Sequence, residues 1–141
     1  MPLRIFKESP VRVPKTSIAE LYRMICTAEG CGSRCHDINL VFTTDRNMRT
    51  LNRRYRGIDK STDVLSFCLD DGVKDGCFQG EIYVSVPAAK RQAKSYGATL
   101  AEENLRLVCH GLLHLMGYDH ERPGDAREMK RLENLYLSRV D

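Results

Sequence analysis

The segment 110–120, with the sequence HGLLHLMGYDH, constrains the fold more than any other part of the chain. It contains three of the four histidines. His110 and His114 are four residues apart, so a helix places both imidazoles on one face, one turn apart. Gly117 can end that helix in a left-handed cap, and the turn that begins there can bring His120 back toward the other two. The fold must therefore present a helix and the loop after it at an open surface.

Three converging imidazoles are the ligand set of an open zinc site, in which water or substrate takes the fourth position. We therefore expect His110, His114 and His120 to bind one Zn²⁺ ion, although imidazole also suits copper, nickel and iron. The alternative is a hydrogen-bonded histidine cluster with a structural role only. Cys109 and the apolar residues of the segment are expected to point away from the ligands and into the core.

Composition limits the class of protein. A length of 141 residues suits one hydrophobic core, so we expect a single domain that spans residues 1–141. The hydrophobic fraction of 42% and the charged fraction of 29% are typical of soluble globular proteins. No apolar run approaches a membrane span, and residues 1–17 lack the apolar region of a signal peptide. We expect a cytoplasmic protein with no membrane partner and with free thiols.

Two local clusters carry alternatives. Cys26, Cys31, Cys35 and His36 lie close together, but they lack the paired C-x-x-C spacing of a structural zinc site, so incidental thiols are the expected interpretation. The net charge of +3 is too small to indicate nucleic-acid binding by itself. A helix would align four arginines in one stripe, which is either a solvated face or a polyanion-binding groove. These arginines are Arg46, Arg49, Arg53 and Arg56.

The hydrophobic periodicity predicts strands and helices in the order strand, helix, strand, helix, strand, strand, helix, helix, helix. The expected strands are 3–6 with 11–13, 38–43, 64–67 and 81–86. The expected helices begin at the Ser17–Glu20 capping box, at Asp45, at Pro87, at the Thr99–Glu102 capping box and at Pro123. This order favours a single-domain α+β fold with a mixed four-stranded sheet and helices mainly on one side. The helix-borne histidine pair makes the arrangement zincin-like.

The motif lacks one catalytic group of the zinc peptidases. In H-E-x-x-H, the glutamate beside the first ligand is the general base, and here that position is Gly111. Asp119 and Glu121 flank the third ligand, but hydrogen bonding around the site is their expected role. A bound zinc ion also supports phosphodiester hydrolysis, which favours a guanidinium aimed at the phosphate oxygens. The residues upstream of the motif supply such arginines.

The chain resembles the YbeY-type endoribonucleases, which mature ribosomal RNA. The first matching motif is the histidine segment, which follows H-G-x-L-H-L-x-G-Y-D-H at every fixed position. The second runs from Leu51 to Phe67 and is similar to L-N-x-x-Y-R-x-x-D-x-x-T-D-V-L-S-F. The segment GEIYVS at 80–85 is similar to a third family motif. The resemblance covers about residues 38–121. Cys68 departs from the family, which commonly has proline there, and the loop at 70–80 is short.

This resemblance implies a zinc-like ion on the three histidines and a functional role for Arg56, the motif arginine. It implies cleavage of single-stranded RNA, with processing of the 3′ end of 16S ribosomal RNA and a role in ribosome quality control. The implied partners are ribosomal RNA and the small ribosomal subunit, and no DNA is expected. Arg53 and Arg54 are candidates for steering the RNA backbone.

Several alternatives stay open at this stage. Arg56 has a structural alternative, an ion pair with Asp59 or Asp63. Hydrogen bonding at the turn before a strand is the expected role of Thr62, Asp63 and Ser66, and core packing that of Tyr55 and Leu65. The rival functions are a metallopeptidase or other zinc-dependent amide hydrolase, and a non-catalytic ribosome-binding protein with a structural metal. The general base is not identified.

Overall fold

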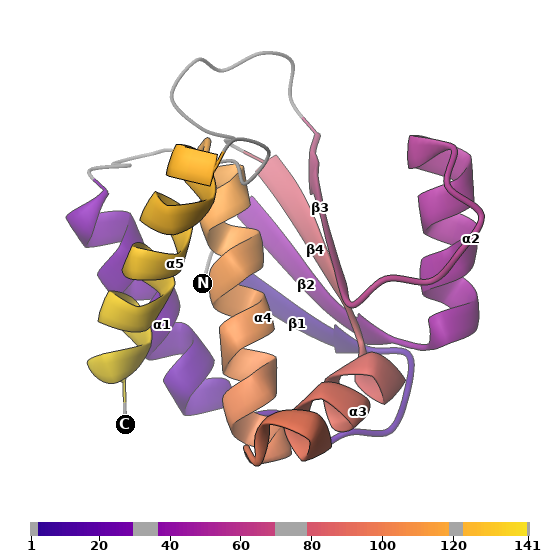
Figure 1. The fold of residues 1–141 in the computed structure, drawn as a ribbon, viewed down its shortest axis with the longest axis horizontal. Coiled ribbons are helices and arrows are strands. Elements are labelled where there is room, and N and C mark those ends of the chain that lie inside the picture. Colours follow the sequence, from indigo (N-terminus) through magenta and orange to yellow (C-terminus); the bar gives the residue numbers. More distant parts are fainter. Residues whose placement is uncertain (1–2, 30–36, 70–78, 119–122, 141) are drawn as a thin grey trace.

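A four-stranded sheet carries the helices of the protein (Figure 1). The computed structural model describes residues 3–29, 37–69, 79–118 and 123–140. The elements, in chain order, are β1 (Leu3–Lys7), α1 (Lys15–Ala28), β2 (Asp37–Thr43), α2 (Asp45–Arg56), β3 (Val64–Cys68), β4 (Gln79–Ser85), α3 (Val86–Tyr96), α4 (Leu100–Leu115) and α5 (Pro123–Ser138). This is the predicted order, and the predicted α+β class is confirmed.

The sheet is mixed, as predicted, and its strand order is β1-β2-β4-β3. β1, β2 and β4 are parallel, whereas β3 runs antiparallel to β4, with Leu65 opposite Tyr83. β3 is therefore an edge strand. Alternate residues of a strand face opposite sides of a sheet, so Ser66 and Phe67 of this edge strand point to different faces.

The hydrophobic core lies between one face of the sheet and three helices. Figure 1 shows α1, α4 and α5 on this face, while α2 lies on the opposite side of the sheet. The inward positions of the central strands and the middle of α4 are fully or almost fully buried. They include Ile38, Leu40, Phe42, Ile82, Val84, Leu107, Val108 and Leu112. The prediction of helices mainly on one side is confirmed.

The predicted signals for the start and end of α4 are present. The side chain of Thr99 accepts a hydrogen bond from the backbone N–H of Glu102, and the carboxylate of Glu102 accepts one from the N–H of Thr99. This capping box satisfies backbone donors that the first turn of a helix leaves unpaired. The helix ends at Leu115, and Gly117 has a φ of +103°, a conformation that favours glycine.

Three local predictions were wrong. Residues 11–13 do not form a strand. The first helix begins at Lys15, because Ile18 already donates its backbone N–H to the carbonyl of Pro14, which places Ser17 inside the first turn rather than at the cap. Tyr55 is 60% exposed, because Met48 and Asn52 occupy the buried side of the short helix α2. Leu65 is buried, as predicted.

The cysteines differ in state. Cys26 and Cys109 are not disulfide-bonded, whereas Cys68 is, so the expectation of free thiols was wrong at that position. Cys109 is fully buried and points off the histidine face of α4, as expected, and burial raises the pKa of its thiol to about 12. Cys31, Cys35 and His36, which belong to the second cysteine cluster, lie outside the described residues.

One carboxylate joins three helices that are distant in sequence. Glu29, directly after α1, accepts hydrogen bonds from the hydroxyls of Tyr118, after α4, and Tyr136, in α5. The bond from Tyr118 is 2.6 Å long. The bond to Glu29 raises the pKa of Tyr118 to about 12, and burial, with the same carboxylate, raises the pKa of Tyr136. Both tyrosines therefore remain hydroxyl donors across the physiological range.

Candidate active site

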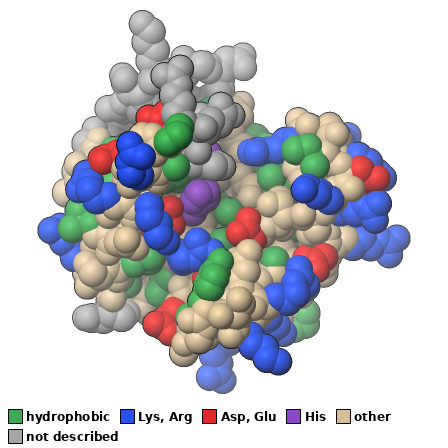
Figure 2. All heavy atoms as spheres, in the orientation of Figure 1, with side chains coloured by type: hydrophobic (Ala, Val, Ile, Leu, Met, Phe, Trp, Pro, Cys, Tyr) green, Lys and Arg blue, Asp and Glu red, His purple; other side chains and the backbone are tan. Residues whose placement is uncertain are grey.

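A cleft of about 400 Å³ opens between α4, the edge strand β3 and the end of α2. On the face shown in Figure 2, histidine is exposed, and basic side chains gather over α2 to one side of it. The cleft is lined by Asn52, Arg56, Ile58, Lys60, Ser61, Thr62, Asp63, Val64, Leu65, Ser66, His110 and His114. It therefore contains two of the three predicted ligands together with the motif arginine.

The last two turns of α4 bring the imidazoles of His110 and His114 to the same wall of the cleft. Their ring centroids are 5.0 Å apart, and the ring planes are inclined at 71°. This is the neighbouring placement that the four-residue spacing predicts on a helix. His120, the third predicted ligand, lies outside the described residues, as do Asp119 and Glu121.

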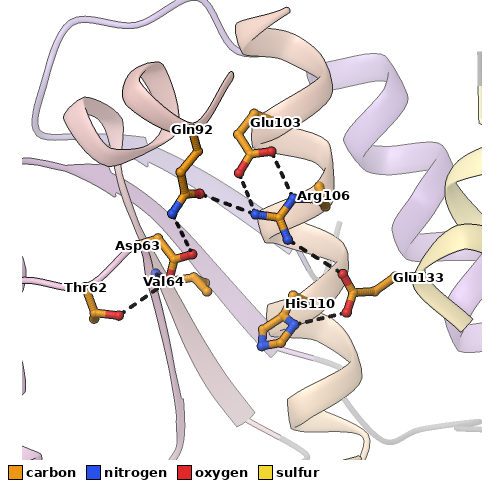
Figure 3. A network of polar contacts seen from close by, with 8 residues as sticks. All are labelled: Thr62, Asp63, Val64, Gln92, Glu103, Arg106, His110 and Glu133. Carbon is orange, nitrogen blue, oxygen red and sulfur yellow. Dashed lines mark hydrogen bonds and ion pairs between the residues drawn. The ribbon is translucent and has the colours of Figure 1, made fainter. Parts of the chain in front are cut away.

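A buried glutamate orients His110 from behind (Figure 3). Oε2 of Glu133, in α5, lies 3.1 Å from Nδ1 of His110. Glu133 is only 4% exposed. An ionised carboxylate only accepts hydrogen bonds, so this contact assigns the proton to Nδ1 and the ring's acceptor lone pair to Nε2. Nε2 is the nitrogen that a metal ligand must offer in this arrangement.

Arg106 connects Glu133 to a wider polar network. Its guanidinium donates to both carboxylate oxygens of Glu103, at 2.9 and 2.6 Å, and lies 3.9 Å from Glu133 Oε1. The bond with Glu103 raises the pKa of Arg106. Arg106 also donates to Gln92, whose amide donates to Asp63 on the opposite wall of the cleft. Figure 3 shows this chain from Asp63 to His110.

Arg56 enters the cleft from the C-terminal end of α2. Its guanidinium donates to the backbone carbonyl of Ser66 over 3.4 Å, a long and weak bond. In the part of the chain that the structure describes, Arg56 forms no ion pair, because Asp59 binds Arg49 and Asp63 accepts from Val64 N–H and Gln92. The structural alternative for Arg56, an ion pair with Asp59 or Asp63, is therefore wrong.

The other motif residues have local roles. Thr62 donates to Asp63, and Ser66 donates to the carbonyl of Gly111, as expected for hydrogen bonding around a turn and strand. Arg53 and Arg54 are exposed and are not among the residues that line the cleft. The guanidinium of Arg54 instead lies over the ring of Tyr55, 5.6 Å from its centroid.

Close packing explains the glycine beside the first histidine. A Cβ atom at Gly111 would lie 2.7 Å from Cγ2 of Ile82 and 3.1 Å from Oγ of Ser66. The helix therefore approaches the sheet so closely that position 111 has no room for a side chain. A glutamate base cannot occupy this position without moving α4 away from β4. This observation argues against peptidase chemistry of the H-E-x-x-H type.

The described residues fit a metal ion. A histidine ligand commonly donates its second nitrogen to a carboxylate, which fixes the ring and its tautomer, and Glu133 does this for His110. Oε1 of Glu133 is buried and has no hydrogen-bond partner within residues 3–29, 37–69, 79–118 and 123–140. A cation on His110 would balance that negative charge. No group of three metal-ligating side chains occurs within these ranges, which do not include His120.

Comparison with known proteins agrees with these features. A family model described as "Endoribonuclease YbeY" matches residues 6–141. The chain belongs to the YbeY family. A YbeY of Pelotomaculum thermopropionicum is 39% identical over 122 residues, which are 83% of this chain and 80% of the relative. A YbeY of Myxococcus xanthus is 48% identical over 104 residues, 72% of this chain.

Coverage of the YbeY relatives differs. The chain spans 35% of the length of the Myxococcus xanthus relative and half of a third relative, from Anaeromyxobacter dehalogenans. Among solved structures, the solution structure of TM1509 from Thermotoga maritima matches with a TM-score of 0.65 and 29% identity. That match covers 96% of this chain and 87% of TM1509.

The buried charges behind the histidines were not predicted from the sequence. Glu133 lies on the buried side of α5 together with Met129, Leu132 and Tyr136, which were predicted to pack there. A carboxylate in an apolar helical stripe was the available signal, because buried charges need a partner. Glu103 gives the same signal in α4, where it is 2% exposed.

Proposed function

We propose that the protein is a zinc-dependent endoribonuclease that cleaves single-stranded RNA. The proposed biological role is maturation of ribosomal RNA, including the 3′ end of 16S RNA, and ribosome quality control, in the cytoplasm and in contact with the small ribosomal subunit. The observation that carries this proposal is the shared cleft of His110, His114 and Arg56. Membership of the YbeY family and the names of the relatives support it.

In this proposal, His110, His114 and His120 would together hold one Zn²⁺ ion. When bound, zinc polarises a phosphoryl oxygen and lowers the pKa of a bound water to about 7. The contact with Glu133 keeps the ring of His110 in the tautomer that binds a metal through Nε2. The histidines would thereby fix the position of the scissile phosphate against the wall formed by α4.

Arg56 would stabilise the charge that develops on the phosphate oxygens. A guanidinium can donate two parallel hydrogen bonds to such oxygens. The present bond to the carbonyl of Ser66 is long, at 3.4 Å, so it can be exchanged for a stronger, charge-assisted bond to phosphate. Asp63 is occupied by the backbone N–H of Val64 and the amide of Gln92, so it is not assigned as the general base.

The competing functions make different predictions. A metallopeptidase would need a base near the first histidine, and the packing around Gly111 disfavours one there. No helix within the described ranges is both long and apolar enough to cross a membrane. A ribosome-binding protein with a purely structural metal would lose its fold together with the metal.

The deciding experiment compares zinc-loaded protein on single-stranded RNA, on duplex RNA and on an unstructured polypeptide, each with and without chelator. We expect chelator-sensitive cleavage of single-stranded RNA only. His114→Ala should reduce cleavage about 10³-fold, because metal catalysis supplies several kcal/mol to the transition state, while circular dichroism remains that of a folded protein. Proteolysis without RNA cleavage, or an unfolded His114→Ala protein, would overturn the assignment in favour of one of the alternatives.

A further inference from the structure

The two buried carboxylates behind the cleft share a single cation. Glu103 and Glu133 are 2% and 4% exposed, and Arg106 faces both of them. The sharing is unequal. Glu103 takes two hydrogen bonds from the guanidinium, whereas Glu133 lies 3.9 Å away from it. Charges removed from water need close partners to offset the lost hydration. Glu133 is therefore the carboxylate with the weaker compensation.

Glu133, the carboxylate whose charge is less compensated, contacts a candidate metal ligand. One of its oxygens contacts His110 Nδ1 at 3.1 Å, and the other has no hydrogen-bond partner in the described part of the chain. Within the described ranges, the side-chain hydrogen bonds of Glu103 come from Arg106 alone, which does not line the cleft. The two carboxylates thus resemble one another in burial and in their shared arginine, and they differ in the contact with His110.

We propose that Glu133 is a positioning residue for the metal centre. It holds His110 in the tautomer that binds a metal, and it supplies a buried negative charge that the ion neutralises. This inference rests on the proposed binding of the ion by His110. Arg106 keeps Glu133 in place without neutralising it fully, because Glu103 takes up the two short bonds of the guanidinium. Arg106 also reaches Asp63 through Gln92, so one hydrogen-bonded network contacts both walls of the cleft.

The proposal predicts that removing the charge of Glu133 weakens metal binding without destabilising the metal-free protein. Carboxylate partners of ligating histidines change metal affinity by about 10- to 100-fold. In Glu133→Gln, the amide oxygen still accepts from His110 and the volume is kept, but the charge is lost. Zinc affinity should therefore fall about 10- to 100-fold. The metal-free protein should not be destabilised, because a buried and partly compensated charge has been removed.

The test measures zinc affinity by competition with a chromophoric chelator, at pH 8, where imidazole is ordinarily neutral. Thermal unfolding is followed in chelator and in zinc. In chelator, the melting temperature of Glu133→Gln should be within about 2 °C of that of the parent, or higher. The rise in melting temperature on adding zinc should be smaller than in the parent. Nitrogen NMR of the imidazole should show that Glu133→Leu loses the fixed Nδ1–H tautomer of His110, whereas Glu133→Gln keeps it.

Two matched variants complete the test. Glu103→Gln removes the other buried carboxylate and should change zinc affinity less than about threefold, because Glu103 makes no hydrogen bond to His110 and the amide oxygen of glutamine can still accept from Arg106. Glu128→Gln removes an exposed carboxylate on α5 that pairs with Arg131, and it should have no effect on affinity. Equal losses in Glu103→Gln and Glu133→Gln would overturn the proposal, as would a Glu133→Gln protein that binds zinc as tightly as the parent.

The outcomes separate this inference from the proposed function. If the parent protein does not bind zinc, and His114→Ala changes nothing, the metal centre itself is wrong. If the parent binds zinc through His114 and Glu133→Gln binds equally well, only the role of Glu133 is wrong. A Glu133→Gln protein that melts well below the parent in chelator would assign Glu133 a purely structural role and contradict the proposal.

Discussion

The two walls of the cleft are built in different ways. The α4 wall, formed by His110 and His114, is backed by the buried carboxylates of Glu103 and Glu133 and by the partly buried guanidinium of Arg106. The α2 wall, which ends in Arg56, has its neighbouring ion pair in solvent, where the side chains of Arg49 and Asp59 are 58% and 53% exposed. Buried charges are costly to unpair, whereas exposed ion pairs contribute little to stability.

This difference suits the two tasks that the walls would perform. A metal ligand must keep its position and tautomer through every turnover, and buried partners with short bonds provide that rigidity. A guanidinium that follows charge onto a phosphate must be able to exchange partners, and among the described residues Arg56 bonds only to one backbone carbonyl, at long distance. We therefore expect changes on the α4 wall to alter metal affinity or packing, and loss of Arg56 on the α2 wall to alter RNA cleavage with little effect on stability.

The largest effect on the α2 wall should come from Arg56→Ala. Removing a donor that stabilises transition-state charge costs about 10²- to 10³-fold in turnover. Unfolding by urea should give almost the same midpoint as the parent, because Arg56 makes no ion pair within the described ranges. Arg56→Lys should restore only part of the activity, since an ammonium lacks the planar fork of a guanidinium. Arg46→Ala, on the exposed first turn of α2, is the control. A large loss of stability in Arg56→Ala would contradict the expectation that Arg56 contributes to cleavage and not to the fold.

Packing on the α4 wall can be tested with Gly111→Ala. The new Cβ would meet Ile82 at 2.7 Å, and overpacking of this kind costs about 1–3 kcal/mol. The free energy of unfolding, measured by urea titration in chelator, should fall accordingly. Gly124→Ala is the matched control, because only the end of the Arg127 side chain approaches, at 3.9 Å. Equal stability of the two variants would show that α4 is free to move away from the sheet.

The Asp45 carboxylate bonds the N-terminal end of α2 to the rest of the fold. It accepts hydrogen bonds from Arg91, Ser85 and Ser61, and the Arg91 guanidinium holds the pKa of Asp45 below its usual range. A lowered pKa gives stability that is present above pH about 4 and is lost as the pH falls through the lower, folded value. Asp45→Asn should cost about 1 kcal/mol near pH 7 after allowance for partial exposure.

The acid dependence gives the control for this variant. The difference in unfolding free energy between the parent and Asp45→Asn should shrink as the pH falls below about 4, because the parent carboxylate is then protonated as well. Urea titrations at a series of pH values would measure it. A difference that stays constant from pH 7 to pH 3 would contradict the ionic contribution.

The smallest effect is expected for Arg49→Gln. The pair of Arg49 with Asp59 is more than half exposed on both sides, so its loss should change the free energy of unfolding by less than about 0.5 kcal/mol. Cleavage should also remain close to that of the parent at moderate salt. A loss above about 1 kcal/mol would mean that the α2 wall depends on its surface ion pairs, and the comparison with the α4 wall would have to be revised.

The sequence predicted the fold well where one element carried several agreeing signals. In α4 the capping box, the apolar stripe and the glycine that follows Met116 all indicated the same helix, and the structure has it. The predicted start of α1 was wrong, because the capping signal at Ser17 competed with an earlier turn that begins at Pro14. The exposure of Tyr55 was also missed, because only the tertiary placement of α2 decides which side of that helix is buried.

Of the candidate site, the sequence predicted only the residues that line the cleft. The spacing of His110 and His114 and the motif arginine are local patterns, and the structure brings these three residues to one cleft. The hydrogen bonds behind these residues join partners that are far apart in sequence. His110 and Glu133 are 23 positions apart, and Asp63 and Gln92 are 29 positions apart. No periodicity relates such pairs, because they meet only when α5 and α3 pack against the rest of the fold.

The carboxylate of Glu29 has a consequence for how the molecule opens. Its partners lie 89 and 107 residues away in the chain, and they join the ends of α1 and α4 to the last turn of α5. Fraying of any one of these helices at that end must release a charged group from its hydroxyl donors. Amide hydrogens there should thus exchange with solvent deuterium as one cooperative unit, slowly and at a common rate, rather than helix by helix.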